Sequence, residues 1–385
     1  MKKISVLGAT GSVGINTLKI IAYNKNKYNV IALTSYKNYK KLAKLALMFN
    51  CKYAVIGKKK YFRNLKEELF GSNIKCLAGY QAICEVSSLS VDILISAIVG
   101  IAGLKPTFAG IGKAKILAIA NKESVISAGS LLLKKAKLKK TKIIPLDSEH
   151  NAIYQILQNE NKSSIKNIVL TASGGPFLKM NKKNFKNITV ADALKHPNWK
   201  MGKKISVDSA SMMNKTFEII EAKKIFDISY KKLSILIHPK SYVHAVLKFK
   251  NGLTKMIVHD TSMEIPIFNS LYNSNRHIRS KKIDLKILNN LEFKKIDLKR
   301  FPVVKLLKKL PEKNSLFETV LVSVNDKLVK LFLNNRIKFT DISKKMNSIL
   351  NLKEFKKYKK LKAKKIEDII NLNKKIEIKM NKKIN

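Results

Sequence analysis

Short apolar runs alternate with helical patterns over residues 1 to about 146, and this alternation constrains the fold more than any other feature. The apolar runs are "ISVLG", "NVIALTS", "YAVIG", "DILISAI", "KILAIAN" and "KIIPLD". Amphipathic helical patterns lie between them, for example at 13–22 and 38–49. Buried strands that alternate with helices are typical of a parallel sheet with crossover helices. The sequence therefore predicts an α/β domain over residues 1–146.

The rest of the chain changes character twice. From about 165 to 290 the apolar runs are longer and partly polar, as in "IKNIVLTAS" and "HAVLKFKNG", which favours a mixed α+β domain. After about 300 the sequence is helical and rich in lysine to the end. A chain of 385 residues is long enough for two or three domains. We expect three, at 1–146, 147–290 and 300–385.

The charge balance is strongly basic, with 77 Lys+Arg against 26 Asp+Glu and a net charge of +51. Nearly all of the excess is lysine, spread along the whole chain, and Ile and Asn are abundant too. An AT-rich genome imposes this pattern through codon usage, so we expect a solvated surface and no nucleic-acid partner. Such a surface still steers anionic substrates such as phosphates.

The cellular setting is indicated by two absences. No apolar run approaches the roughly 18 residues that span a bilayer, so we expect no membrane partner. The three cysteines, Cys51, Cys76 and Cys84, are odd in number and lack metal or redox spacing. A reducing cytoplasm is therefore the expected location.

A glycine-rich turn follows the first apolar run. In "ISVLGATGSVG", Gly8, Gly11 and Gly14 lie between a strand and a helix that begins near Val13. Glycines at such a turn let the backbone approach a pyrophosphate, which then meets the free N–H groups of the helix. The spacing GxxGxxG is also compatible with a tight turn that binds nothing.

The second apolar run indicates which dinucleotide would bind. An NAD site carries an acid near the end of this strand, to bind the ribose 2′-hydroxyl. The first 66 residues contain no acid, and "VIALTS" is followed by Lys37 and Asn38. Lys37 and Asn38, with Ser35, could contact the 2′-phosphate of NADP, which favours NADP over NAD. Lysine is abundant throughout this chain, so the missing acid is the stronger argument.

Two acids lie together in "LDSEH". Asp147 ends a predicted strand, Glu149 follows it, and a helix is expected from about His150. Ligands bind at the carboxyl edge of such a sheet. Asp147 and Glu149 would equally suit helix capping and the helix dipole.

A third acid, Glu218, lies on a predicted helix downstream of "KISVDS", which we predict to be a strand that ends at Ser209. Asn214, Lys215 and Glu218 are three or four residues apart and so share one helix face. An exposed Lys–Glu pair would give the same spacing. Three carboxylates with no paired His or Cys suit Mg²⁺ or Mn²⁺ rather than zinc.

An anion site is indicated between these acids. In "LTASGGPF" a strand ends in Ser173, and the N–H groups of the two following glycines can form a nest for an anion. "HPNWKMGKK" follows, with His196 and the only tryptophan, Trp199. We expect 196–204 to be a mobile lid that closes over bound substrate, although a lone tryptophan is often part of a core.

In this order, the motifs resemble the 1-deoxy-D-xylulose 5-phosphate reductoisomerase family. The matching stretches cover roughly 1–270 and are "GATGSVG", "AIVGIAGLKPT", "ANKES", "LDSEHNAI", "LTASGGPF", "HPNWKMGKKISVDSASMMNK" and "LIHPKSYVH". The resemblance implies a homodimeric enzyme with a Rossmann-like NADP-binding domain, a catalytic and dimerisation domain and a C-terminal helical domain. It implies conversion of 1-deoxy-D-xylulose 5-phosphate to 2-C-methyl-D-erythritol 4-phosphate with NADPH and Mg²⁺ or Mn²⁺, in non-mevalonate isoprenoid synthesis.

The same resemblance implies a role for each matching residue. The implied metal ligands are Asp147, Glu149 and Glu218, with Lys122 as the fourth catalytic residue. The implied substrate contacts are Lys122, Ser148, Glu149, Ser173, His196, Trp199, Ser209, Asn214, Lys215 and Glu218. The implied cofactor contacts are Thr10, Gly11, Ser12, Val13, Lys37, Asn38, Asn121, Glu123 and Gly202.

The implied reaction is a retro-aldol/aldol rearrangement followed by reduction with hydride from NADPH, with Lys122 stabilising enolate charge. The sequence departs from the family pattern at four positions. Tyr36 replaces a usual Gly, Lys240 a Gln, Glu264 an Arg and Asp326 a Glu. No departure removes an implied metal ligand.

Two other classes of function remain open at this point. An aldehyde or acyl-phosphate dehydrogenase would share the glycine-rich opening, but it needs a nucleophilic cysteine. The three cysteines lie in the expected nucleotide domain without a polar catalytic setting. An NADP-sensing or nucleic-acid-binding protein would not need three carboxylates.

Overall fold

The computed structural model of the chain describes residues 1–199, 201–272 and 277–384. Its contacts divide it into two compact units, each with its own sheet. Unit 1 comprises Met1–Ser124, Leu131–Asn151 and Met263–Arg279, and unit 2 comprises Val125–Ser130, Ala152–Ser262 and Ser280–Asn385. Among the described residues we find no helix with both the length and the apolar character that crossing a bilayer requires.

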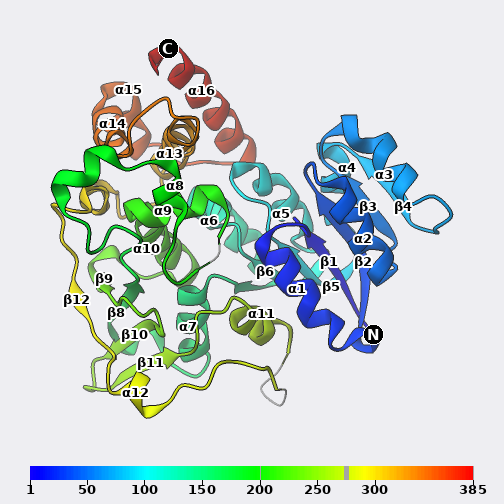
Figure 1. Ribbon diagram of the computed structural model, residues 1–385, viewed down its shortest axis with the longest axis horizontal. Coiled ribbons are helices and arrows are strands. Elements are labelled where there is room, and N and C mark those ends of the chain that lie inside the picture. Colours follow the sequence, from blue (N-terminus) through cyan, green and yellow to red (C-terminus); the bar gives the residue numbers. More distant parts are fainter. Residues whose placement is uncertain (200, 273–276, 385) are drawn as a thin grey trace. The chain divides into compact units, whose positions relative to one another are not determined.

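Unit 1 is built on a parallel sheet of seven strands, in the order β4-β3-β2-β1-β5-β6-β7 (Figure 1). Its elements are β1 (Lys2–Leu7), α1 (Ser12–Ala22), β2 (Tyr28–Ser35), α2 (Tyr39–Phe49), β3 (Tyr53–Ile56), α3 (Phe62–Glu68), β4 (Lys75–Ala78), α4 (Tyr80–Ser87), β5 (Val91–Ser96), α5 (Leu104–Gly110), β6 (Ala114–Ile119), β7 (Lys142–Pro145) and α11 (Glu264–Leu271). Helices α6 (Lys122–Leu138) and α7 (Ser148–Leu157) contribute to both units. The six predicted strands are confirmed, and the strand order reverses between β1 and β5, where ligands bind in such sheets.

Alternate residues of the strands supply two apolar faces to this sheet. On β2, Leu33 packs with the helices α1 and α2 in the main core cluster of the unit. Its neighbour Ala32 belongs to a second cluster, which it forms with Val55 of β3 and with Ile83 and Val86 of α4. Because successive side chains of a strand point to opposite faces, helices cover both sides of the sheet.

Helix α11 returns to unit 1 from far downstream. Ile267, Phe268 and Leu271 belong to the same core cluster as α1, and the hydroxyl of Tyr28 donates to the carbonyl of Leu271 at 3.1 Å. The compact units therefore differ from the three predicted domain spans: 263–279 joins unit 1, and the C-terminal helices join unit 2. The apolar face of α11 decides this, and no local pattern reveals which core receives it.

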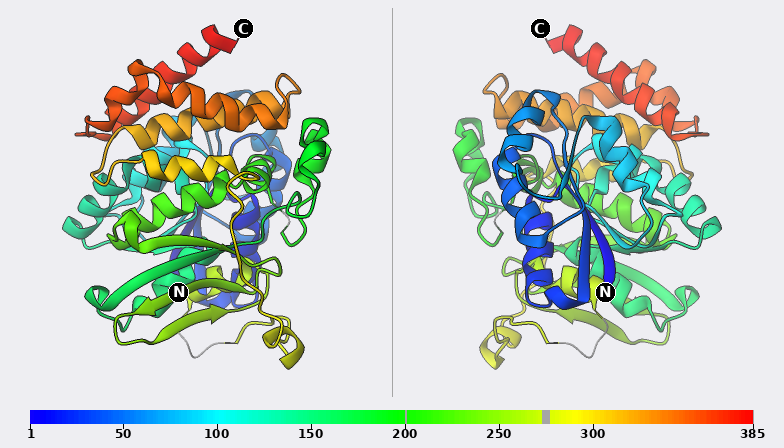
Figure 2. Two further views of the ribbon diagram at one scale, coloured as in Figure 1. Left: turned by 90° about the vertical axis from the view of Figure 1, so that its left-hand side faces the viewer. Right: turned by 90° about the vertical axis from the view of Figure 1, so that its right-hand side faces the viewer.

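Unit 2 is built on a mixed sheet of five strands, in the order β11-β10-β8-β9-β12. Its elements are β8 (Ile165–Ala172), α8 (Val190–Leu194), α9 (Lys203–Ser211), α10 (Met213–Phe226), β9 (Leu233–Ile237), β10 (Val243–Phe249), β11 (Thr254–Val258), α12 (Leu285–Leu288), β12 (Lys294–Lys295), α13 (Phe317–Leu333), α14 (Phe339–Asn351), α15 (Lys353–Lys356) and α16 (Ile366–Ile384). Strand β8 pairs in parallel with β9 and antiparallel with β10, which confirms the expected mixed α+β character. The predicted C-terminal helices pack together, with α13 against α14 and α16 (Figure 2).

One predicted element was wrong. The run "KISVDS" forms α9 (Lys203–Ser211) rather than a strand that ends at Ser209. Its Ile-Ser-Val alternation imitates a strand, but Lys204 pairs with Asp208 one turn later at 3.2 Å. Asp208 also accepts a hydrogen bond from Asn325 of α13 at 2.7 Å. This buried tertiary contact requires the helical spacing and overrides the local pattern.

A buried ion pair ties α10 to the start of α13. The ammonium of Lys224 lies 2.8 Å from a carboxylate oxygen of Glu318, and both side chains are at most 5% exposed. Asn314 accepts a further hydrogen bond from Lys224 at 2.6 Å, and Ser315 donates to Glu318. Such a pair is satisfied only while both partners are present, since a lone buried charge is costly.

Replacing Glu318 with Leu should lower the free energy of unfolding by about 3–5 kcal/mol, because Lys224 then stays buried without its partner. Urea unfolding followed by Trp199 emission measures the loss. The pair Lys223–Glu312 supplies the control, since the Glu312 side chain is 47% exposed and Glu312→Gln should cost no more than about 1 kcal/mol. A Lys224→Met/Glu318→Leu double variant should recover most of the stability, and equal losses in both single variants would contradict this account.

Candidate active site

The turn after β1 has the geometry of a backbone cradle. Gly8 has a φ of +82°, and a Cβ there would lie 2.7 Å from the carbonyl oxygen of Ala97. A Cβ on Gly14 would lie 2.5 Å from the carbonyl oxygen of Gly8. Helix α1 begins at Ser12, with Gly11 as its N-cap residue. The predicted strand, turn and helix are thus confirmed, and the first amides of α1 face the turn as anion donors.

The end of β2 is bonded to this turn. Thr34 accepts hydrogen bonds from the amides of Gly8 and Ala9, at 2.9 and 2.8 Å, and the hydroxyls of Thr10 and Ser35 lie 2.8 Å apart. Tyr36, Lys37 and Asn38 follow and are exposed. Asn38 also caps α2 by accepting the amide of Lys41 at 3.1 Å. The polar groups predicted to bind a dinucleotide therefore lie along one edge of the sheet.

A buried polar side chain caps the start of α6. Asn121 caps the helix by accepting the amide of Ser124 at 2.7 Å, and its amide nitrogen donates to the carbonyl of Gly100 at 2.8 Å. Lys122 and Glu123 follow in the first turn and are buried. The ammonium of Lys122 lies 2.6 Å from Asp147, which joins the ends of β6 and β7.

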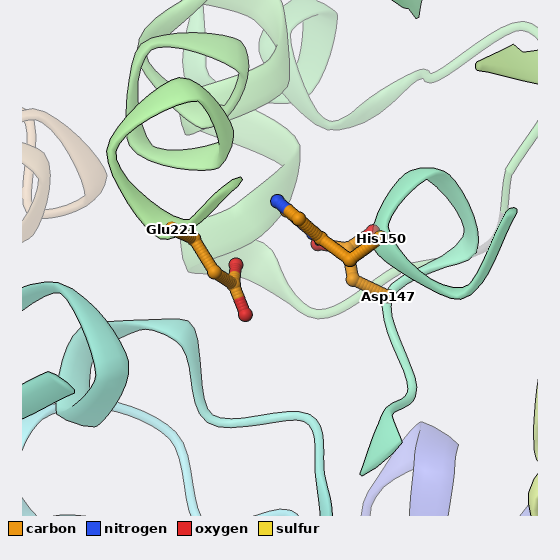
Figure 3. A group of neighbouring side chains, drawn as sticks. All are labelled: Asp147, His150 and Glu221. Atoms are coloured by element: carbon orange, nitrogen blue, oxygen red, sulfur yellow. The ribbon is translucent and has the colours of Figure 1, made fainter. Parts of the chain in front are cut away.

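The two acids of "LDSEH" lie at the start of α7. The carbonyl of Asp147 accepts the amide of Asn151 at 2.8 Å, so Asp147 takes the N-cap position, while its carboxylate pairs with Lys122. Ser148 donates to Glu149 at 2.6 Å. Figure 3 shows Asp147 and His150 beside the first turn of α7. The capping interpretation and the ligand interpretation are thus compatible for Asp147.

Unit 2 carries the third acid. Glu218 lies on α10 and is 1% exposed. It accepts hydrogen bonds from Asn214, at 2.5 Å, and from Lys215. The predicted shared face of these three residues is therefore confirmed, and the exposed-pair alternative is not. Met212, between α9 and α10, has a φ of +66°, a strained conformation that is common beside functional sites.

A nest of positive-φ glycines follows β8. Gly174 and Gly175 have φ values of +85° and +67°, and the amide of Gly175 donates to the hydroxyl of Ser173 at 3.1 Å. A Cβ on Gly175 would lie 3.0 Å from the carbonyl oxygen of Ser209, so the nest packs against α9. Successive amides in this conformation form a concave donor surface for an anion.

His196 connects the nest to the segment that carries Trp199. Its Nδ1 accepts the amides of Asn198 and Trp199, at 3.1 and 3.0 Å. The proton of the neutral ring is therefore on Nε2, which lies 3.1 Å from the hydroxyl of Ser173. Burial lowers the pKa of His196 to about 4. His196 is thus a neutral donor at physiological pH.

Trp199 is half-buried, with its ring centroid 6.3 Å from that of His244. Asn198 donates to the carbonyl of Pro239 at 2.7 Å and to Ser241 at 3.0 Å, which links this segment to the β9–β10 connection. Lys200, inside the predicted lid, lies outside the described residues. Gly202 belongs to unit 2, whereas the other predicted cofactor contacts belong to unit 1.

Two buried titratable residues were missed by the sequence interpretation, one in each unit. Glu221 of α10 and His150 of α7 are at most 1% exposed, and Figure 3 shows both side chains. Glu221 lies three residues after Glu218 in "EIIEA", and a second buried acid in an acid-poor chain was a usable signal. His150 gave no such signal, since a histidine in a first helical turn is unremarkable without tertiary information.

The cysteines do not supply a nucleophile. Burial raises the pKa of Cys51 to about 12 and also raises the pKa values of Cys76 and Cys84. A catalytic cysteine instead has a lowered pKa, because its thiolate is the reactive form. This argues against the dehydrogenase alternative that shares the glycine-rich turn.

A parallel sheet with a glycine cradle at its strand-order reversal, together with buried acids on a second unit, defines a dinucleotide-dependent enzyme. Family models agree along the chain. The 1-deoxy-D-xylulose 5-phosphate reductoisomerase model matches residues 4–129, and two C-terminal domain models of the same enzyme match 143–226 and 259–378. The chain belongs to the 1-deoxy-D-xylulose 5-phosphate reductoisomerase family.

Individual relatives cover nearly the whole chain. The 1-deoxy-D-xylulose 5-phosphate reductoisomerase of Pelagibacter ubique is 50% identical over 99% of both chains. That of Wolbachia pipientis subsp. Culex pipiens is 44% identical over 97% of this chain and 95% of its own. A crystal structure of DOX-P reductoisomerase with NADPH, fosmidomycin and magnesium superposes with a TM-score of 0.93 at 35% identity, covering 100% of this chain and 98% of its own. The Zymomonas mobilis enzyme with NADPH gives 0.89 at 36% identity, covering 98% and 97%.

The lowered pKa of His196 predicts a pH dependence of stability. Below its ordinary pKa of 6.5 the unfolded chain binds a proton at this ring, whereas the native protein does not until about pH 4. Stability should therefore fall as the pH drops from 6.5 to 4, and His196→Asn should flatten this window. An NMR titration of the ring measures the native pKa directly, and a midpoint near 6.5 would contradict the burial argument.

Proposed function

We propose that the chain converts 1-deoxy-D-xylulose 5-phosphate to 2-C-methyl-D-erythritol 4-phosphate, with NADPH and a divalent metal, in non-mevalonate isoprenoid precursor synthesis. The match of reductoisomerase models to both ends of the chain carries this proposal. It is supported by the acid–lysine pairs at the ends of β6 and β7 and on α10. The proposed roles of individual residues follow.

The cofactor role belongs to unit 1. Thr10, Gly11, Ser12 and Val13 are proposed to hold the pyrophosphate, because the first amides of α1 and the bonded hydroxyls of Thr10 and Ser35 lie there. Lys37 and Asn38 are proposed to meet the 2′-phosphate, supported by their exposure at the end of β2. Asn121, Glu123 and Gly202 complete the proposed cofactor contacts. NADPH itself was bound in the solved relatives.

The metal role is proposed for Asp147, Glu149 and Glu218. All three offer carboxylate oxygens, which are the ligands that Mg²⁺ and Mn²⁺ prefer. Magnesium was bound in a solved relative. When bound, the cation supplies a Lewis acid for substrate oxygens and NADPH supplies the hydride. The donor set therefore fits the proposed cation without a further ligand type.

Two of the three proposed ligands, Asp147 and Glu218, already have a lysine partner. Lys122 pairs with Asp147, and Lys215 pairs with Glu218. These ammonium groups are proposed to turn to the substrate when a cation takes over the carboxylates, with Lys122 facing the negative charge that develops on an enolate oxygen. A fixed ammonium group in a site of low dielectric stabilises such negative charge at little reorganisation cost.

The phosphate of the substrate is proposed to bind at the nest after β8. Ser173, the two glycine amides and the neutral Nε2–H of His196 are donors only a few ångströms apart. Ser209 abuts the nest, and Asn214 and Lys215 of α10 are proposed as further substrate contacts. Ser148 is the remaining proposed substrate contact. Neutral donors and a single lysine together suit a dianion that must also be released.

The segment 196–204 is proposed to close over the substrate, with Trp199 against its carbon skeleton. Trp199 is only half-buried, and Gly202 would tolerate a Cβ without any contact within 4 Å. Closure excludes water from a reactive aldehyde. The bonds from His196 to the amides of this segment would couple phosphate binding to its position.

Two further features are proposed more briefly. The chain is proposed to form a homodimer, and the open edge strand β11, whose first three residues are exposed, offers backbone groups for pairing. It is proposed to act in the cytoplasm, which suits its three free cysteines.

One assay tests the function and the metal site together. NADPH oxidation in the presence of 1-deoxy-D-xylulose 5-phosphate should require Mg²⁺ or Mn²⁺ in the wild type. Glu218→Gln keeps the size of the side chain, but it loses the ligand charge, and its single amide oxygen can accept from only one of Asn214 and Lys215. The variant should lower kcat/KM at least about 100-fold, since a Lewis acid is worth several kcal/mol. NADPH affinity serves as the internal control and should be unchanged, and full metal-dependent activity in Glu218→Gln would rule out this ligand.

The lid proposal has its own measurement in the single tryptophan. A phosphonate substrate analogue with Mg²⁺ should shift the emission of Trp199, because the ring moves against the bound ligand. Trp199→Ala should lower kcat/KM while the melting temperature stays nearly constant. A large fall in melting temperature, with wild-type emission that is already blue and indifferent to the analogue, would show that Trp199 is a core residue.

A further inference from the structure

Two lysines lie just beyond the ends of β2 and β3, Lys37 after the first strand and Lys58 after the second. Ser35 pairs with Ile56 in the parallel ladder. Beyond the ladder the two chains stay bonded, because Gly57 donates to the carbonyl of Ser35 and Lys58 to that of Tyr36, both at 2.8 Å. Lys37 and Lys58 therefore lie in the bends that follow two strands running side by side (Figure 1).

Tyr36 holds the second of these lysines. Its ring is 66% exposed and lies against Gly57, where a Cβ would come within 2.9 Å of the ring. The ammonium of Lys58 lies 5.5 Å from the centroid of the Tyr36 ring, within cation–π range. Lys58 is half-buried, whereas the two lysines after it are exposed.

The next lysine along the chain has a different direction. The stem of Lys59 packs against Gly79, where a Cβ would lie 3.0 Å from its Cε. Gly79 follows β4, so Lys59 turns away from β2. Lys58 and Lys59 thus carry the same charge in the same loop, but only Lys58 contacts the end of β2.

We propose that Lys58 reads the 2′-phosphate of NADP(H) together with Lys37, and that Tyr36 is the positioning residue that holds the ammonium of Lys58 at this edge. The inference rests on the proposed NADP site. A phosphate monoester carries a charge of about −1.5 to −2 at neutral pH, which two ammonium groups match better than one. NADH ends in a hydroxyl there and gains nothing from the second lysine.

Calorimetric titration of the full chain with NADPH, NADH and 2′,5′-ADP tests the assignment. Lys58→Gln should raise the dissociation constants of NADPH and 2′,5′-ADP about 10-fold, because a charge-assisted contact is lost, and should leave that of NADH unchanged. Lys58→Arg should restore most of the affinity. Lys59→Gln, which removes the same charge from the same loop, should stay within about twofold of the wild type, since it loses only a distant and screened charge.

The positioning role of Tyr36 has a separate readout. Tyr36→Phe keeps the ring and should retain the wild-type ratio of NADPH to NADH affinity. Tyr36→Leu keeps an apolar side chain but removes the cation–π contact, so the ratio should fall about 2- to 5-fold. A merely structural role would weaken both cofactors equally and leave the ratio unmoved.

The outcomes separate this inference from the function on which it rests. Wild-type protein that binds NADH as tightly as NADPH would overturn the NADP preference itself. If the wild type prefers NADPH and Lys37→Ala loses this preference, but Lys58→Gln behaves like Lys59→Gln, then only the role of Lys58 is overturned. Affinity for 5′-AMP, which lacks the 2′-phosphate, shows whether a variant still folds around the adenosine end.

Discussion

Charge compensation of buried carboxylates is the constraint on which both units depend. The chain has few acids, and three that are buried or half-buried lie within contact distance of a lysine, because an unpaired charge away from water is costly. Lys122 is the partner of Asp147, Lys215 of Glu218 and Lys224 of Glu318. The first two pairs lie where function is proposed, and the third holds α10 against α13. The same interaction therefore stabilises the fold and prepares the candidate site.

Unusual backbone conformations mark the same regions. Gly8 and Gly174 have positive φ values at the two turns proposed to bind phosphate groups, and Met212 has one where α9 meets α10. A positive φ at a buried methionine costs energy that the surrounding packing must offset. Here Met212 separates α9 from α10, so that Asn214 and Lys215 lie in the first turn of α10.

The lysines of this protein fall into two structural groups. Most lysines are exposed and spread along the chain, as expected of biased codon usage. Lys122, Lys215 and Lys224 are instead buried beside acids, and Lys58 lies half-buried over the ring of Tyr36. Composition cannot separate these groups, because the distinction depends on which neighbour each ammonium meets. Contact geometry separates them at once.

The sequence by itself determined the local part of this protein. The strand, turn and helix around Gly8 and Gly14, the missing acid after β2, and the shared face of Asn214, Lys215 and Glu218 all follow from short-range periodicity and residue chemistry. The family motifs added the reaction.

Only the tertiary structure decided the rest. It made "KISVDS" a helix through the contact of Asp208 with Asn325, and it returned α11 to unit 1 through Phe268 and Leu271. It also set the tautomer of His196 and the partner of Lys58. These features either join residues that lie far apart in the chain or depend on the direction of one side chain. The local sequence pattern predicts neither kind of feature, because the packing energy that decides both comes from contacts between distant segments.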